Sequence, residues 1–135
     1  MPEYRSESLT RTLATLHKEA PGLHGSAVVT QEGLVIAVYP AGWDSDIHDP
    51  LGGDNVSAMA AVVAELAGKT LTRLDQGKLE RVLMEGERGT VGVFPATEEA
   101  ALAVLITKDA KLGLTMQAAR RATEQIRAIL DKPAG

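Results

Sequence analysis

The stretch DNVSAMAAVVAELAGKTLTRL, residues 54–74, decides the fold because it carries the longest helical pattern in the chain. Its apolar residues recur at spacings of three and four, which predicts a helix with one buried stripe. We expect that stripe to comprise Val56, Met59, Ala60, Val63, Leu66, Ala67, Leu71 and Leu74. Gly52 and Gly53 break the chain before the helix, and the Asp54 side chain is expected to cap its first free N–H groups.

The opposite face of this helix is also apolar at its start. Ala58, Ala61 and Val62 lie there, and no charged residue follows before Glu65. A surface helix of a small domain normally has one apolar face and one polar face, so this helix is expected to be buried on two sides. A domain of this size has a single core. The second side is therefore predicted to contact another protein chain.

Composition limits the classes of function. The 135 residues are 44% hydrophobic, which predicts a single domain spanning 1–135 with a core at about 4–131. The chain has no cysteine, so disulfides and thiolate chemistry are excluded, and we expect a cytoplasmic protein without membrane insertion. A net charge of −4 and only four aromatic residues argue against nucleic-acid binding. Proteins are the expected partners.

Further periodic patterns lie on both sides of the central helix. They predict helices at 4–19 and 112–130, and strands at 23–30, 34–39, 79–87, 90–94 and 101–106. The run ALAVLI at 101–106 has no polar face and is expected to be a central strand covered on both sides. The predicted fold is an α+β sandwich in the order α-β-β-α-β-β-β-α. Its five-stranded antiparallel sheet has the terminal helices on one face and the central helix on the other.

Three segments accompany this order of elements: GLHGSAVVTQEGLVIAV, NVSAMAAVVAEL and KLGLTMQAARRATEQIRAIL. Together with the order of elements, they resemble the Roadblock dynein-light-chain family. Among its branches the sequence is most similar to the bacterial one, which includes the gliding-motility regulator of a Ras-like GTPase. The resemblance covers about residues 9–130. It implies a homodimer in which the central helices pack side by side and the third strands pair edge to edge.

The resemblance also implies a non-enzymatic regulator or scaffold that binds a small Ras-like GTPase, with no catalytic, cofactor or metal residues. The residues expected at the dimer interface lie on the central helix and the third strand: Ala58, Ala61, Val62, Glu65, Lys69, Arg81 and Leu83. A signalling adaptor without effect on GTP hydrolysis is the first alternative. A small-ligand sensor or minor hydrolase that uses the loop 41–53, near Trp43 and His48, is the second.

Two other patterns carry possible ligands for ions or phosphate. The first is an acidic loop whose side chains could coordinate a cation: Asp44, Asp46, His48, Asp49 and Asp54. Their spacing does not match a calcium-binding loop. A solvated loop or a contact surface is therefore favoured over a weak ion site. The triplet 68–70, Gly-Lys-Thr, ends like a phosphate-binding loop, but it lies inside the predicted helix and lacks the first glycine. Close approach of a second helix explains this glycine better.

Nucleophile and arginine-finger chemistry find little support. Ser26 follows His24 and Gly25 but lacks the Gly-x-Ser-x-Gly elbow. Strand alternation predicts His24, Ser26 and Val28 on one face, opposite Gly25, Ala27 and Val29. The pair Arg120 and Arg121 is interpreted as a solvated helix face rather than a finger that reaches a GTPase active site.

Overall fold

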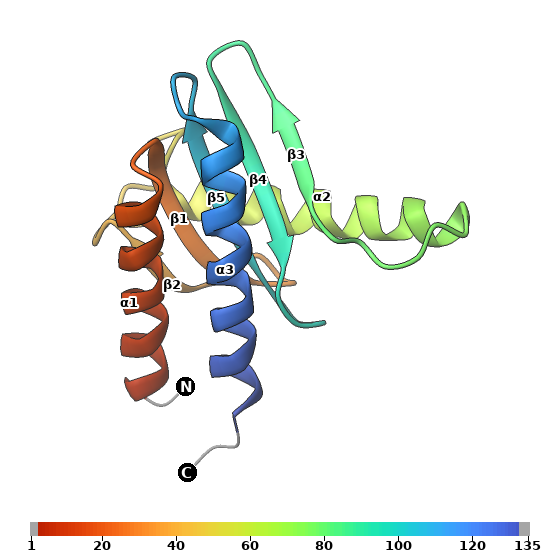
Figure 1. The fold of residues 1–135 in the computed structure, drawn as a ribbon, viewed down its shortest axis with the longest axis horizontal. Helices are drawn as coiled ribbons and strands as arrows, with labels where there is room; N and C mark the ends of the chain where they lie inside the picture. The colour runs from red at the N-terminus through yellow and green to blue at the C-terminus, as the bar shows by residue number, and fades with distance from the viewer. Residues whose placement is uncertain (1–2, 133–135) are drawn as a thin grey trace.

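The computed structural model describes residues 3–132, which form three helices and five strands (Figure 1). In chain order these are α1 (Glu3–Glu19), β1 (Leu23–Thr30), β2 (Val35–Tyr39), α2 (Gly53–Arg73), β3 (Val82–Glu85), β4 (Gly89–Pro95), β5 (Ala100–Thr107) and α3 (Leu112–Asp131). The predicted order of elements is therefore confirmed. Within the described range, no helix combines the length and apolar character needed to cross a bilayer.

The strands form one antiparallel sheet in the order β2-β1-β5-β4-β3. Strand β5 lies at its centre, where Val104 pairs with Ser26 of β1 and Gly92 of β4. This agrees with the continuous apolar run that predicted a strand covered on both faces. At the two edges lie β2, whose register with β1 shifts near Val29, and the short strand β3.

Helices α1 and α3 cover one face of the sheet and α2 crosses the other face, as predicted (Figure 1). The larger core lies under α1 and α3. It is built from their apolar stripes and from the side chains of β1, β4 and β5 that face them, including Leu9, Leu13, Leu16, Phe94, Leu102, Val104, Ala119 and Ile126. The fully buried leucines of α1 follow the spacing seen in the sequence.

The smaller core lies between the sheet and α2. Its buried members are Ala27, Val29, Trp43, Val56, Ala60, Val93 and Ala103. Only Val56 and Ala60 of this set belong to α2, so the helix contacts the sheet mainly through its first half. Small side chains dominate this contact, which allows the helix backbone to approach the sheet closely.

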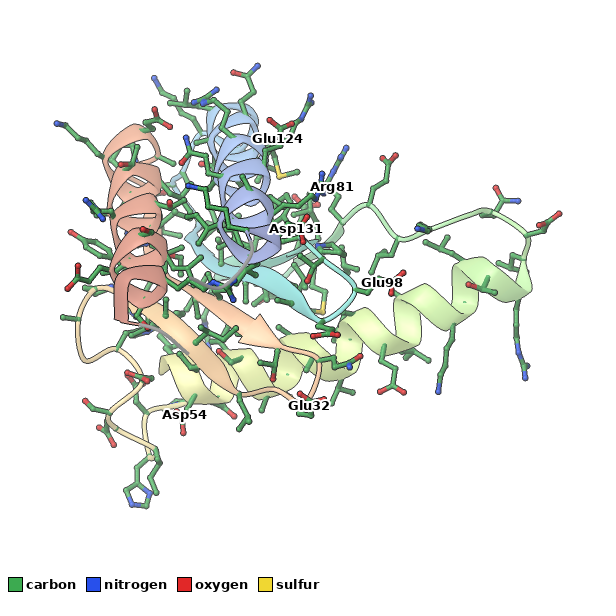
Figure 2. The ribbon with its side chains drawn as sticks, turned by 90° about the horizontal axis from the view of Figure 1, so that it is seen from below. Glu32, Asp54, Arg81, Glu98, Glu124 and Asp131 are labelled. Atoms are coloured by element: carbon green, nitrogen blue, oxygen red, sulfur yellow. The ribbon has the colours of Figure 1, made fainter. Side chains whose placement is uncertain are left out.

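Local predictions at the start of α2 and at β3 were wrong in detail. The N-cap of α2 is Gly52, which makes no side-chain hydrogen bond. Asp54 lies at the second position of the helix (Figure 2), so it is not the N-cap. Its carboxylate accepts a hydrogen bond from the N–H of Asn55, which is one of the first free N–H groups as predicted, and faces the positive end of the helix dipole. The predicted strand 79–87 is restricted to Val82–Glu85, because only these residues pair with β4.

The predicted buried stripe of α2 was also wrong at three positions. Met59, Leu66 and Leu74 are 53%, 66% and 63% exposed. The sheet contact runs through Val56 and Ala60, as predicted, and through Gly53 and Ser57; these four are the buried residues of the helix. The physical reason is that α2 has more apolar surface than one sheet face can cover.

Candidate interaction surface

The second half of α2 extends past the edge of the sheet. Every buried residue of the helix lies at or before Ala60, and the ribbon continues well beyond β3 (Figure 1). Three large apolar side chains from the middle of α2 onward are exposed: Met59 at 53%, Val62 at 58% and Leu66 at 66%. Isolated exposed aliphatic residues are common on proteins, but a continuous group on one helix marks an interaction surface.

Strand β3 supplies a second exposed element beside the helix. It pairs with β4 through Val82↔Val93 to Glu85↔Thr90, and at the end of the sheet its other edge has no neighbouring strand within residues 3–132. Leu83 and Met84 are each 36% exposed, whereas Val82 packs into the smaller core with Ala64 of α2. An unpaired strand edge offers its N–H and C=O groups to another strand.

All of the residues predicted for the dimer interface are accessible in the protomer. Ala58 and Val62 are exposed, and Ala61 is half-buried. Glu65 and Lys69 form an exposed ion pair one helical turn apart, with 3.0 Å between Oε1 and Nζ. Leu83 lies on β3, and Arg81 is exposed on the segment that leads into it (Figure 2). Their role at an interface stays a prediction.

The two flanks of α2 differ in side-chain size. A helix turns by about 100° per residue, so positions two apart lie on nearly opposite sides. Met59 therefore lies opposite Ala61, and Leu66 lies opposite Gly68. One flank carries the large exposed aliphatic side chains of Met59, Val62 and Leu66. The other carries Ala61, Gly68 and Thr72, which line a groove described below. We call these the large flank and the small flank of α2.

Loop 41–53 is held to the domain by Trp43. The indole Nε1 donates a hydrogen bond to the Leu51 carbonyl oxygen at 2.7 Å, and the ring lies so close to Gly25 and Gly53 that a Cβ added at Gly25 would be 2.4 Å from it. The loop carboxylates cap local turns: Asp46 accepts the His48 N–H, and Asp49 accepts the Leu51 N–H. Within residues 3–132, no three His, Asp or Glu side chains group in a way that could hold a metal ion.

Ser26 has a histidine neighbour that sequence reasoning did not identify. His17, in the last turn of α1, places Nε2 2.8 Å from the fully buried Ser26 Oγ, and its ring centroid lies 4.6 Å from that of Tyr39. Burial lowers the pKa of His17 from 6.5 to about 4, so the ring is neutral near pH 7. Because Ser26 is shielded from solvent, a substrate cannot reach its hydroxyl. The sequence signal was the position of His17 four residues after Leu13 on the α1 stripe.

His24 does not share the face of Ser26, contrary to prediction. The register of β1 shifts between Leu23 and Gly25, so Leu23 packs in the larger core while the exposed His24 ring lies 6.2 Å from the Trp43 ring. Gly25, Ala27 and Val29 face α2 and Trp43 as expected. The irregular pairing at the start of β1 is the physical reason for the difference.

The remaining motifs have structural explanations. The triplet at 68–70 lies inside α2, as predicted, and the Thr70 hydroxyl donates a hydrogen bond to the Leu66 carbonyl oxygen. No second helix of residues 3–132 approaches Gly68, since an added Cβ there would meet no atom within 4 Å. Arg121 contacts Glu19 of α1, with 3.3 Å between Nη2 and Oε1, and Arg120 is exposed on α3.

Comparison with known proteins identifies relatives of this chain. The Roadblock/LC7 domain family matches residues 9–106. An uncharacterized protein of Methanocaldococcus jannaschii, MJ1340, is 34% identical over 121 residues, which are 90% of this chain and 98% of the relative. A second uncharacterized protein of that organism, MJ0310, is 33% identical over the same length and the same shares of the two chains.

Solved structures share the fold. The gliding protein MglB of Thermus thermophilus superposes with a TM-score of 0.81 at 23% identity, covering 96% of this chain and 93% of that chain. MglB of Myxococcus xanthus gives 0.82 at 14% identity, covering 100% and 98%. A Roadblock/LC7 domain from Streptomyces avermitilis gives 0.79 at 21% identity, covering 91% and 98%.

Proposed function

Since the chain belongs to the Roadblock/LC7 domain family, we propose that it is a non-enzymatic, homodimeric regulator that binds a small Ras-like GTPase and modulates its nucleotide state or hydrolysis. The observation that supports the dimer is the apolar surface of α2 and β3 that the protomer leaves exposed. The GTPase follows only from the resemblance to the bacterial branch of the family. We propose a cytoplasmic location on the same basis.

The large flank of α2 is the main part of the proposed interface. Met59, Val62 and Leu66 are all more than half exposed in the protomer. Complete burial of one aliphatic side chain stabilises a structure by about 1.5–3 kcal/mol, so covering the exposed parts of these three gives roughly 3–5 kcal/mol per protomer. In a two-fold dimer each contact occurs twice, which brings the total into the range of a stable association.

The edge of β3 completes the proposed interface. Pairing β3 with its copy would satisfy its free backbone groups and join two sheets into one, while Leu83 and Met84 would gain neighbours. The positions predicted from sequence (Ala58, Ala61, Val62, Glu65, Lys69, Arg81 and Leu83) stay part of this proposal. Met59, Leu66 and Met84 are added to them because they carry the larger exposed apolar area.

The test of the GTPase proposal is an affinity pull-down of the tagged protein from its native lysate, with a GTP analogue or with GDP, read by mass spectrometry. We expect a Ras-like GTPase enriched in the GTP-analogue sample, and single-turnover GTP hydrolysis by that GTPase should change when this protein is added. Recovery of the GTPase without any change in hydrolysis would favour the adaptor alternative. Recovery of no GTPase in either nucleotide state would refute the proposed partner.

A further inference from the structure

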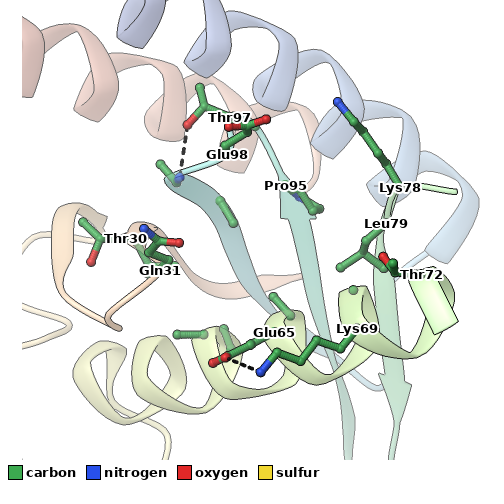
Figure 3. A pocket seen from close by; sticks show the side chains of 18 of the residues that line it. Thr30, Gln31, Glu65, Lys69, Thr72, Lys78, Leu79, Pro95, Thr97 and Glu98 are labelled. Atoms are coloured by element: carbon green, nitrogen blue, oxygen red, sulfur yellow. Dashed lines mark hydrogen bonds and ion pairs between the residues drawn. The ribbon is translucent and has the colours of Figure 1, made fainter.

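A groove of about 1060 Å³ runs along the small flank of α2 (Figure 3). Ala61, Gly68 and Thr72 of α2 line one side of it. The end of β4 and the connection to β5, at Pro95 and Thr97, line the other side, and Leu79 also lines the groove. Pockets for small molecules are typically about 300–1000 Å³, so this groove has room for a segment of polypeptide.

The walls of the groove are built from unusually small side chains. Among its lining residues are Ala61, Ala64 and Gly68 of α2, and Ala96 and Ala100 at the ends of the β4–β5 connection. No described atom lies within 4 Å of a Cβ added at Gly68, so the space beside this glycine is open rather than filled by a neighbouring side chain. Short side chains on both walls let the backbone of a bound segment approach closely, and they leave room for its own apolar side chains.

The rim of the groove is positively charged. Lys69, Arg73, Lys78 and Arg127 lie on it, against only two carboxylates, Glu65 and Glu98. One of these carboxylates, Glu65, is already paired with Lys69. Arg127 is held in place because its Nε donates a hydrogen bond to the Ala96 carbonyl oxygen at 2.6 Å. The excess of cations is notable on a chain with a net charge of −4.

We propose that this groove docks an acidic segment of a partner protein, with small aliphatic side chains against the alanine walls and carboxylates against the basic rim. A segment of opposite charge is favoured by the field of the rim, and burial of its apolar side chains supplies affinity. The groove lies on the flank opposite Met59 and Leu66. It shares Ala61, Glu65 and Lys69 with the proposed dimer interface, whereas Gly68, Arg73, Lys78 and Arg127 belong to the groove alone. The site therefore goes beyond the proposed dimer and GTPase.

The test is fluorescence anisotropy with the 135-residue protein and two labelled peptides of about 15 residues. The first peptide contains Glu, Ala and Leu, and in the matched peptide every Glu is replaced by Lys. We expect the acidic peptide to bind with a Kd of about 10–100 µM and the basic peptide to bind at least about tenfold more weakly. The charge-reversal variant carrying Arg73→Glu and Lys78→Glu should lose binding of the acidic peptide.

A matched pair of variants at Gly68 separates docking in the groove from general charge attraction. Gly68→Leu places a large side chain in the open space and should weaken binding of the acidic peptide at least about tenfold, whereas Gly68→Ala should keep it within about twofold. Light scattering should give the same mass for both variants, because Gly68 is not among the residues proposed for the dimer interface. This readout distinguishes loss of docking from loss of the dimer.

Three results would overturn the proposal. The acidic peptide could fail to bind at concentrations up to about 1 mM, which corresponds to less than about 4 kcal/mol of binding free energy. Gly68→Leu could bind it as tightly as the wild type. The protein could bind vesicles containing phosphatidylserine in place of the peptide, and the charge-reversal variant could lose this vesicle binding. That result would assign the basic rim to a membrane surface.

Discussion

Replacing Leu66 by glutamate is expected to convert the proposed dimer into a monomer. Leu66 is 66% exposed in the protomer, so the change removes little from the core of a single chain. Glutamate also has nearly the same helix propensity as leucine, and α2 should stay intact. The effect should therefore appear in association and not in protomer folding.

The expected magnitude follows from the exposed fraction of Leu66. About two-thirds of its burial free energy, or roughly 1–2 kcal/mol, is available to an interface, and two-fold symmetry doubles this to about 2–4 kcal/mol. Each buried and unpaired carboxylate adds a cost of about 3–5 kcal/mol, part of which is relieved by solvent at the rim of the contact. A total of at least about 5 kcal/mol raises the dimer Kd more than about a thousandfold.

Sedimentation velocity measures the mass of the protein in solution. A protein concentration of about 10 µM suits a wild-type dimer Kd of about 1 µM or below. The wild type should sediment at twice the protomer mass, and the Leu66→Glu variant at the protomer mass of 14.2 kDa. The matched control is Leu114→Glu on α3, a leucine 45% exposed on the opposite side of the sheet, which should remain dimeric. A Leu66→Glu protein that keeps the dimeric mass would refute the placement of the interface on the large flank.

Three further substitutions test separate parts of the structure. Placing aspartate at both Ala61 and Val62 should also give a monomer by light scattering, because like charges would meet across the two-fold axis; an unchanged dimer would exclude this face of α2 from the interface. The pKa of His17 is lowered to about 4, so the unfolded chain binds more protons than the folded chain below pH 6.5, and about 2–3 kcal/mol of stability should be lost as the pH falls from 6.5 to about 4. Urea unfolding at pH 7.5 and 4.5 should show a smaller loss for His17→Gln, and equal losses would contradict this assignment. Gly25→Ala should destabilise the domain by about 1–3 kcal/mol and shift the emission of Trp43 to the red, since the new Cβ would lie 2.4 Å from the indole; unchanged emission would mean that the ring moves away without exposure.

The order and pairing of the elements could be predicted because each follows from a local pattern. The stripe of Leu9, Leu13 and Leu16 predicts α1, and these residues are completely or almost completely buried. The apolar run in β5 predicts a central strand, and β5 pairs on both sides. The contact between His17 and Ser26 was not predictable in this way, because it joins a helix to a strand through tertiary packing.

Strand β3 shows where local pattern is insufficient. Residues 79–87 alternate well enough to predict a strand, yet only Val82–Glu85 form one. Strand length at an edge is set by the partner strand, and the pairs with β4 run only from Val93 to Thr90. The family resemblance implied that this strand pairs with a second chain, but the local sequence pattern does not say where its pairing with β4 stops.

In helix α2, the second apolar side and part of the buried stripe were predictable from the sequence, whereas the exposure of the largest side chains was not. A pattern analysis assumes that the most apolar stripe faces the core, which places Met59 and Leu66 inward. The sheet below α2 is approached through Val56 and Ala60 of that stripe, but not through its large side chains, because Trp43 already fills part of that layer and small side chains are needed for close contact. The large side chains are thereby turned outward. Side chains that are exposed in both the unfolded chain and the protomer contribute their burial free energy only when a partner covers them, which is why the large flank and not the small one is the surface that Leu66→Glu tests first.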